Sequence, residues 1–156
     1  MHHEHNHVRE LLQGFDTAML VTHLPNGHLR SRPMAIAQKG EAGDLWFATR
    51  VDSPKVDEIQ GDHDVNVTCQ KEDRFLSLSG TAELIQDREA LDRLWDEAWR
   101  AWFPDGTESQ QLALIHVIPH EADAGKCGLL RLAGRKDPVH VSRRHWPRVR
   151  ARLQRD

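Results

Sequence analysis

The stretch that decides the fold is Leu45-Trp46-Phe47-Ala48-Thr49-Arg50-Val51-Asp52-Ser53-Pro54-Lys55-Val56-Asp57-Glu58-Ile59. It begins with an apolar run that ends at Thr49 and Arg50 and is typical of a β-strand. Ser53 is a favoured helix N-cap and Pro54 a favoured first helical residue, so together they mark the start of a helix. The stretch therefore predicts a strand, a short turn and a helix.

Groups that bind anions surround the predicted start of this helix. The first amides of a helix have no partner within it, and the helix dipole favours negative charge at that end. Two hydroxyls and two cations lie close by in the sequence, on Thr49, Ser53, Arg50 and Lys55. A phosphate, with a charge of about −1.5 to −2, needs several such donors at once. An ordinary capped helix with Lys55 in solvent also fits, and the local motif leaves both interpretations open.

The length of the chain, 156 residues, is enough for one domain with a substantial core. There is no apolar stretch of about 18 residues and no signal sequence, so we expect a cytoplasmic protein without a membrane span. Cys69 and Cys127 lie far apart in no ligand-like spacing, which predicts reduced, buried thiols and no metal site. The histidines within residues 2–7 fit a loose metal-binding tail or a frayed, soluble end, and we favour the frayed end.

Charge is divided unevenly along the chain. Residues 1–134 carry 13 Lys and Arg against 22 Asp and Glu, a net charge of −9, whereas residues 135–156 carry 8 against 2, a net charge of +6. We therefore divide the chain into a body, residues 1–134, and a basic C-terminal tail, residues 135–156. A dedicated nucleic-acid module would normally carry its basic residues on the binding face of the fold, so this distribution makes nucleic acid an unexpected partner.

Short β-prone runs separated by turns make up most of the body. We predict strands at residues 18–22, 28–38, 44–49, 65–69, 75–85 and 112–118, the last ending before Pro119. Residues 129–132 are either a further strand or part of the tail. Gly80 is expected to mark a bulge or a barrel corner.

Helices are predicted at residues 4–13, 54–60 and 88–102. The last is capped by Asp87 and carries an apolar stripe at helical spacing, formed by Leu91, Leu94, Trp95, Ala98, Trp99 and Trp102. The early strands are joined too closely for the helical crossovers of a parallel sheet. The order therefore predicts a mainly β protein, an antiparallel split β-barrel with flanking helices.

Several motifs resemble the general stress protein 26 family, a branch of the pyridoxamine 5′-phosphate oxidase-like flavin-binding split barrels. These motifs are Ser31-Arg32-Pro33-Met34, Gly43-Asp44-Leu45-Trp46-Phe47-Ala48-Thr49, Ser53-Pro54-Lys55-Val56-Asp57-Glu58-Ile59, Leu78-Ser79-Gly80-Thr81-Ala82, Asp87-Arg88, Leu94-Trp95 and Ala101-Trp102-Phe103-Pro104. Their order agrees with the family over roughly residues 8 to 123, which is far more specific than any single motif.

The resemblance implies a homodimer of split barrels that binds FMN at the subunit interface. By position, it implies that Arg32 and Lys55 contact the FMN phosphate and that Thr49 and Ser53 add hydroxyl donors. The phosphate site inferred from the residues alone and the one implied by the family therefore coincide.

The resemblance also implies which residues lie along the flavin ring. Pro33 and Met34 would lie along the isoalloxazine, and the Ala48-Thr49 backbone would line the cofactor. Trp102 and Phe103 are candidates to cover the flavin of a partner subunit. Met34 and most of the tryptophan stripe also fit ordinary core packing.

Two departures from the family bear on activity. Ala124-Gly125 stands where family members often carry an aromatic pair, a difference expected to open or weaken the flavin pocket. The chain ends Arg152-Leu153-Gln154-Arg155-Asp156 and lacks the Arg-Leu-x-Pro substrate motif of the true oxidases, so we do not expect oxidation of pyridoxine phosphate. Its scattered histidines are interpreted as structural or solvated, and the catalytic residues stay unknown.

Three functions are compatible with the sequence. The first is an FMN-binding flavoprotein that acts as an oxidoreductase, and the second is a non-catalytic flavin-binding or flavin-storing stress protein. The third is a binder of nucleic acid or an acidic partner through the arginines of the tail, Arg143, Arg144, Arg148, Arg150, Arg152 and Arg155. Trp146, Val149 and Leu153 instead predict that the tail is a docking helix starting near Pro147, and the acidic body favours docking.

Overall fold

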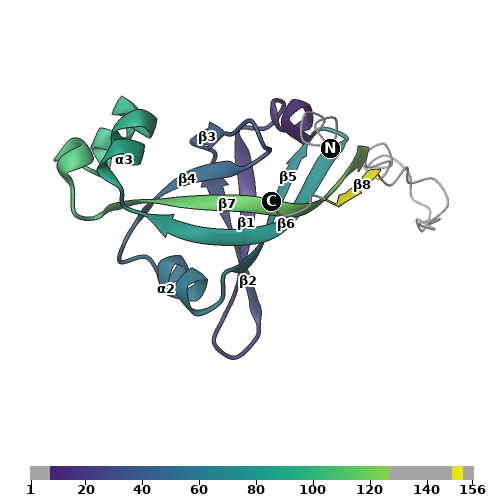
Figure 1. Cartoon of the computed structure of the whole chain (residues 1–156), viewed down its shortest axis with the longest axis horizontal. Coiled ribbons are helices and arrows are strands. Elements are labelled where there is room, and N and C mark those ends of the chain that lie inside the picture. Colours follow the sequence, from purple (N-terminus) through teal and green to yellow (C-terminus); the bar gives the residue numbers. More distant parts are fainter. Residues whose placement is uncertain (1–7, 127–148, 153–156) are drawn as a thin grey trace, which may run out of the picture.

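The computed structural model describes residues 8–126 and 149–152, and within them the strands form one eight-stranded antiparallel sheet. The strand order is β2-β1-β5-β6-β7-β4-β3, and β8 pairs with β7. The strands are β1 (Thr17–His23), β2 (Leu29–Ala35), β3 (Gln38–Lys39), β4 (Leu45–Arg50), β5 (Asp64–Lys71), β6 (Arg74–Ile85), β7 (Leu112–Lys126) and β8 (Val149–Arg152). The sheet curls until β2 contacts β4 (Figure 1). This confirms the predicted antiparallel, split-barrel architecture.

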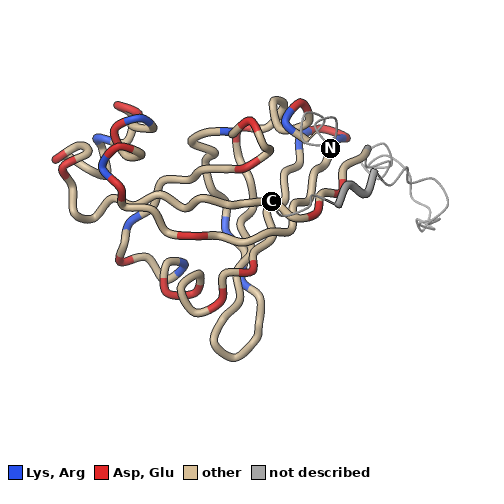
Figure 2. The backbone as a smooth tube through the Cα atoms, viewed as in Figure 1, with Lys and Arg blue, Asp and Glu red and all other residues tan. Residues whose placement is uncertain are grey.

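Short helices flank the sheet. Helix α2 (Pro54–Gly61) joins β4 to β5 and packs against β1 and β6. Helix α3 (Arg88–Leu94) and the 3₁₀ helices η1 (Glu97–Ala101) and η2 (Gly106–Glu108) lie beyond one end of β6 and β7 (Figure 1). Residues 8–12 are also helical, within the predicted helix 4–13. Charged residues gather on helices and turns, whereas the strands carry few (Figure 2).

Within residues 8–126 and 149–152, every helix is too short or too polar to span a membrane.

The predicted helix over residues 88–102 is wrong as a single element. It stops at Leu94, and the chain continues through the extended residue Trp95, at φ −54° and ψ 131°, before η1 begins. The Asp96 carboxylate accepts a hydrogen bond from the Ala98 amide at 2.8 Å and caps η1. Asp favours this N-cap role over a helix interior, so a new helix starts where the apolar spacing alone predicts continuation. The predicted Asp87 cap of α3 is confirmed.

The sequence predicts a strand that ends before Pro119, but β7 continues through this residue. Pro119 stands opposite Gly80, where the register between β6 and β7 shifts. Proline has no amide to give to the ladder and is tolerated at such an irregularity. A Cβ on Gly80 would lie 2.1 Å from the carbonyl oxygen of Ile118, so only glycine permits this approach. The prediction of a bulge at Gly80 is confirmed.

The described part of the tail is a strand. Residues 149–152 form β8, so the prediction of a docking helix is wrong there. The register of β8 on β7 sets Arg150 opposite Asp123 and Arg152 opposite Glu121. The strand predicted at residues 129–132 lies outside the described residues, as does Cys127, and the division at residue 134 stays a prediction.

Two apolar clusters form the core. The first fills the inside of the curled sheet and includes Leu20, Phe47, Val67, Leu78 and Ile115. The second lies under α3 and consists of Ala90, Leu91, Phe103, Leu112 and Leu114. Side chains alternate along β4, so Phe47 joins the first cluster while Trp46 and Ala48 pack against the second. Strand β4 thereby separates the barrel interior from the face that carries the candidate site.

Candidate functional site

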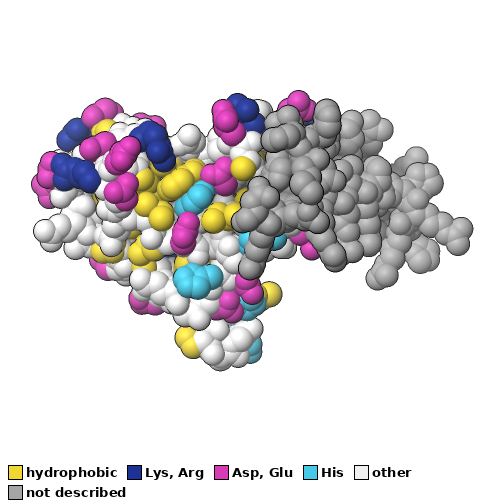
Figure 3. Space-filling model, viewed as in Figure 1, with side chains coloured by type: hydrophobic (Ala, Val, Ile, Leu, Met, Phe, Trp, Pro, Cys, Tyr) yellow, Lys and Arg dark blue, Asp and Glu magenta, His cyan; other side chains and the backbone are white. Residues whose placement is uncertain are grey.

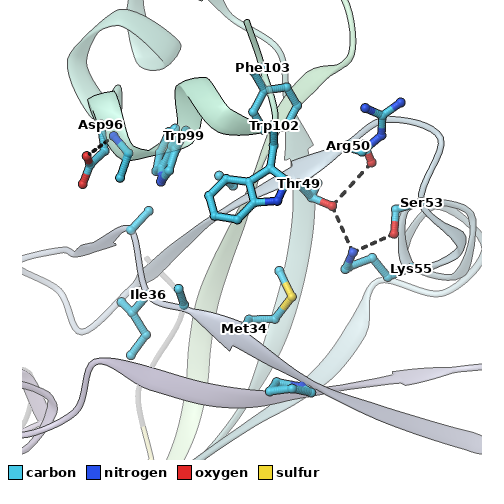
Figure 4. Close-up of a pocket in the computed structure, with 15 residues that line it drawn as sticks. Met34, Ile36, Thr49, Arg50, Ser53, Lys55, Asp96, Trp99, Trp102 and Phe103 are labelled. Carbon is cyan, nitrogen blue, oxygen red and sulfur yellow. Dashed lines mark hydrogen bonds between the residues drawn. The ribbon is translucent and has the colours of Figure 1, made fainter. Parts of the chain in front are cut away.

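A cleft of about 710 Å³ lies between β2, β4, the start of α2 and η1 (Figure 4). Eight of the nine residues that the sequence assigns to a cofactor line it, namely Pro33, Met34, Ala48, Thr49, Ser53, Lys55, Trp102 and Phe103. Arg32 is not among the lining residues. Arg50, which the sequence places near the helix start, also lines the cleft. Six further lining residues are not assigned to the site by sequence reasoning, namely Ala35, Ile36, Ala37, Asp96, Ala98 and Trp99.

Lys55 lies at the polar end of the cleft (Figure 4). Its ammonium donates hydrogen bonds to Ser53 Oγ at 2.6 Å and to Thr49 Oγ1 at 3.1 Å. Burial lowers the pKa of Lys55, and the positive charge of Arg32 lowers it further against the opposing effect of Glu58. Among the residues that the structure describes, no carboxylate forms an ion pair with it. A half-buried ammonium held only by hydroxyls favours an anionic ligand.

The Ser53 hydroxyl distinguishes the two interpretations of this helix start. Ser53 occupies the N-cap position, as predicted, but its side chain makes no capping hydrogen bond. It accepts from Lys55 instead. The amides of Ser53 and Val56 bond to the carbonyl oxygens of Arg50 and Ser53. An ordinary helix capped by its serine side chain, with Lys55 in solvent, therefore does not describe this helix start.

Arg50, the other cation near the helix start, is already paired. Its Nε lies 2.9 Å from Asp52 Oδ1 and its Nη2 lies 3.0 Å from Asp52 Oδ2. The hydrogen bonds and opposite charges raise the pKa of Arg50 and lower that of Asp52. The pair is exposed and close to neutral as a unit, so it adds little positive charge to the cleft.

Arg32 lies behind the polar end of the cleft in a buried network. Its Nη2 donates to Glu58 Oε2 at 2.6 Å and its Nη1 to Thr22 Oγ1 at 2.7 Å. Glu58 also accepts from Thr22 Oγ1 at 2.6 Å and from Arg30 Nη1 at 2.7 Å. Burial raises the pKa of Glu58, but these hydrogen bonds and the charges of both arginines outweigh it, so the net shift is downward.

Sequence reasoning missed Glu58. A glutamate in a short helix looks like a surface residue until its partners on β1 and β2 are known. Only its place among Val56 and Ile59, the other buried residues of α2, hints that it faces inward.

The remainder of the cleft is mostly apolar. Met34 from β2 and Trp102 after η1 lie on opposite sides of it (Figure 4). Trp102 is 66% exposed, whereas Phe103 is 5% exposed and belongs to the core under α3. Trp102 is thus free to cover a flat aromatic ligand, and Phe103 supports the wall behind it.

None of the histidines among the described residues lines this cleft. His116 stacks on Trp46 with ring centroids 3.9 Å apart, and its Nε2 lies 2.7 Å from Asp44 Oδ2. On the face of the molecule seen in Figure 3, apolar side chains gather over β4 and β7. His63 and His120 form hydrogen bonds with groups on β6. Within residues 8–126 and 149–152, no three His, Cys, Asp or Glu side chains gather as a metal site would require.

Comparison with protein families gives a match over residues 3–126 to the family described as pyridoxamine 5′-phosphate oxidase like. Among curated proteins, Protein bli-3 of Neurospora crassa is 31% identical over 102 residues, which are 58% of this chain and 49% of that protein. The chain thus spans about half the length of this relative.

Solved structures share the fold. The general stress FMN/FAD binding protein of Xanthomonas citri is 26% identical, with a TM-score of 0.66 over 90% of this chain and 100% of that chain. A protein of Clostridium acetobutylicum related to general stress protein 26 has a TM-score of 0.69 over 81% of this chain and 90% of that chain. It is 16% identical, so its likeness shows the fold alone.

Proposed function

The chain belongs to the pyridoxamine 5′-phosphate oxidase-like family, and on that premise we propose that it is an FMN-binding flavoprotein of the general stress protein type. The proposal rests first on Lys55, a half-buried ammonium that has only hydroxyl partners among the described residues. A charge that has no ion-pair partner among the described residues, at the polar end of a mostly apolar cleft, is the feature that a phosphorylated aromatic ligand would complete.

The polar end of the cleft fits a phosphate monoester. Lys55 provides charged donors, and the hydroxyls of Ser53 and Thr49 turn toward it from the helix start and the end of β4. Each charge-assisted hydrogen bond contributes on the order of 1.5 to 3 kcal/mol, so two or three can support affinity near the micromolar range.

The apolar end fits an isoalloxazine ring. Pro33, Met34, Ala48, Thr49 and Trp102 line this part of the cleft. Because the cleft is open and Trp102 is 66% exposed beside it, we propose that a second copy of the chain covers the flavin in a homodimer. Light scattering should then give twice the mass of one chain.

Bound FMN would supply the redox chemistry, and the protein would position the ring and limit access to water. The residues that line the cleft include no histidine, cysteine or tyrosine. Of the acid-base groups that do line it, Lys55 is assigned to the phosphate and Asp96 caps η1, which favours simple electron or hydride transfer. The same observation supports the second candidate, a flavin-binding or flavin-storing stress protein without turnover.

Two measurements test the proposal in order. Protein purified gently should absorb in the visible range, or take up added FMN, at one flavin per chain. Mixing the loaded protein with NADH or NADPH and then an acceptor should show repeated reduction and reoxidation for an oxidoreductase, and none for a store. Failure to bind FMN under any of these conditions would remove both candidates.

A further inference from the structure

The charged residues that line the cleft lie at its two ends. Arg50 and Lys55 belong to the polar end, where Arg50 is already paired with Asp52. Asp96 also lines the cleft, and Figure 4 shows it beside Trp99, at the end away from Lys55. The described lining therefore has an ammonium at one end and a carboxylate at the other.

Asp96 brings a negative charge that no neighbouring cation cancels. Its side chain is exposed, and Oδ1 accepts a hydrogen bond from the Ala98 amide at 2.8 Å. Among the residues that the structure describes, no lysine, arginine or histidine forms an ion pair with it. An aspartate in contact with water is ionised at neutral pH. The capping bond is thus its only described partner, and the charge stays available to a ligand.

Apolar side chains occupy the space between the two charged ends. Met34 and Trp102 lie between Lys55 and Asp96, and Ile36 lines the cleft near Trp99 (Figure 4). An FMN whose phosphate binds at Lys55 would extend its ring along these side chains toward Asp96. Because an apolar lining excludes water, a charge at the far end acts on the ring more strongly than it would in bulk solvent.

Reduction changes the charge of a flavin ring. At neutral pH the oxidised ring is neutral, and it takes up two electrons and one proton, so the reduced ring carries one negative charge. A carboxylate beside the ring raises the free energy of this anion more than that of the neutral ring. Reduced FMN should therefore bind more weakly than it would without that carboxylate, which is equivalent to a lower reduction potential.

We propose that Asp96 lowers the reduction potential of bound FMN by holding a negative charge at the ring end of the cleft. This inference rests on the proposed function, because it takes the phosphate to lie at Lys55 and the ring to extend away from it. Asp96 transfers no proton in this role. It adjusts the cofactor through its charge while its side chain caps η1.

The deciding variant is Asp96→Asn in the full-length protein. Asparagine caps a helix about as well as aspartate, so this change removes the charge and keeps an acceptor for the Ala98 amide. The measured quantity is the midpoint potential of bound FMN, titrated anaerobically with dithionite against a reference dye. It gives the dissociation constant of reduced FMN divided by that of oxidised FMN. We expect this ratio to fall about three- to tenfold, and to fall less at high salt.

Asp87→Asn is the matched control. Asp87 caps α3 by accepting a hydrogen bond from the Ala90 amide at 3.1 Å, but it does not line the cleft. The ratio should change by less than about 1.5-fold in this variant. An unchanged ratio in Asp96→Asn overturns the inference, and so does an equal fall in both variants. Should Asp96→Asn fail to fold, Asp96→Ser, which also provides a cap, decides by the same criterion.

The binding of oxidised FMN separates this inference from the proposed function. Wild-type protein that binds no FMN overturns both. Wild-type protein whose preference for FMN over riboflavin survives Lys55→Gln overturns the placement of the phosphate, and the role of Asp96 with it. If that preference is lost in Lys55→Gln while Asp96→Asn leaves the potential unchanged, only the role of Asp96 is overturned.

Discussion

Lys55 Nζ donates a hydrogen bond to Ser53 Oγ at 2.6 Å, across the first turn of α2. The serine that would ordinarily cap the helix therefore serves to aim a lysine into the cleft. This exchange leaves the helix without a side-chain cap and gives the cleft a directed positive charge. It is the local arrangement on which the proposed phosphate site depends.

As pH rises, FMN binding should begin to weaken at a lower pH than the ordinary lysine pKa of 10.5 would predict. The pKa of Lys55 lies below the usual 10.5, first because of burial and then because of Arg32. Only the protonated ammonium attracts the phosphate, so affinity for FMN should fall as pH rises through this lowered pKa. Riboflavin, which lacks the phosphate, provides the control. Parallel pH profiles for the two flavins between about pH 7 and pH 10 would contradict this prediction.

Ionisation of Glu58 should make the free energy of unfolding depend on pH in the acidic range. Its folded pKa lies below the ordinary 4.5, because hydrogen bonds and two arginines outweigh the effect of burial. Its stabilising contribution is therefore present above the unfolded value and is lost as pH falls through the folded one. Glu58→Gln should cost about 3 to 5 kcal/mol at pH 7.

Denaturant unfolding of wild type and Glu58→Gln at a series of pH values checks this prediction. The difference in the free energy of unfolding should shrink as the pH is lowered from about 5. Asp57→Asn, on the exposed side of the same helix, should change stability by less than about 0.5 kcal/mol. A difference that is constant over the whole pH range would show that the Glu58 carboxylate is not the stabilising group.

Gly80→Ala should destabilise the fold by about 1 to 3 kcal/mol. The new Cβ would lie 2.1 Å from the Ile118 carbonyl oxygen, which is fixed backbone and cannot yield as a flexible side chain can. Gly61→Ala is the control, since no atom lies within 4 Å of the position of its new Cβ. Thermal melts of both variants test the prediction, and equal melting temperatures would contradict it.

Much of the body could be predicted because the relevant signals are local. Alternating apolar residues identified the strands, Ser53-Pro54 identified the start of α2, and Gly80 identified the bulge. The helix over residues 88–102 failed because apolar spacing continues through Asp96, whose side chain prefers to cap a new helix. Strand β7 extends past Pro119 only because a glycine stands opposite it on another strand.

The candidate site was predictable where its residues come from one continuous stretch. Thr49, Ser53 and Lys55 meet because a strand, a turn and a helix follow one another directly. The pairing of Arg32 with Glu58 joins residues 26 positions apart, and no local pattern specifies it. It could be seen only once the sheet had placed β2 beside α2.

Removal of the tail should lower the stability of the fold, and we expect the protein not to bind DNA with or without the tail. Truncation after Gly134 deletes β8, whose backbone pairs with β7. We expect a lower melting temperature and no salt-dependent DNA binding in either form. DNA binding that weakens with salt and disappears on truncation would instead favour the nucleic-acid hypothesis.

The most direct test of the central claim compares FMN with riboflavin in wild type and in Lys55→Gln. Titration of flavin fluorescence gives both dissociation constants under the same conditions. If Lys55 holds the phosphate, FMN affinity should fall about 10- to 100-fold, and riboflavin affinity should change less than about twofold. An equal loss for both flavins would contradict the phosphate site at Lys55.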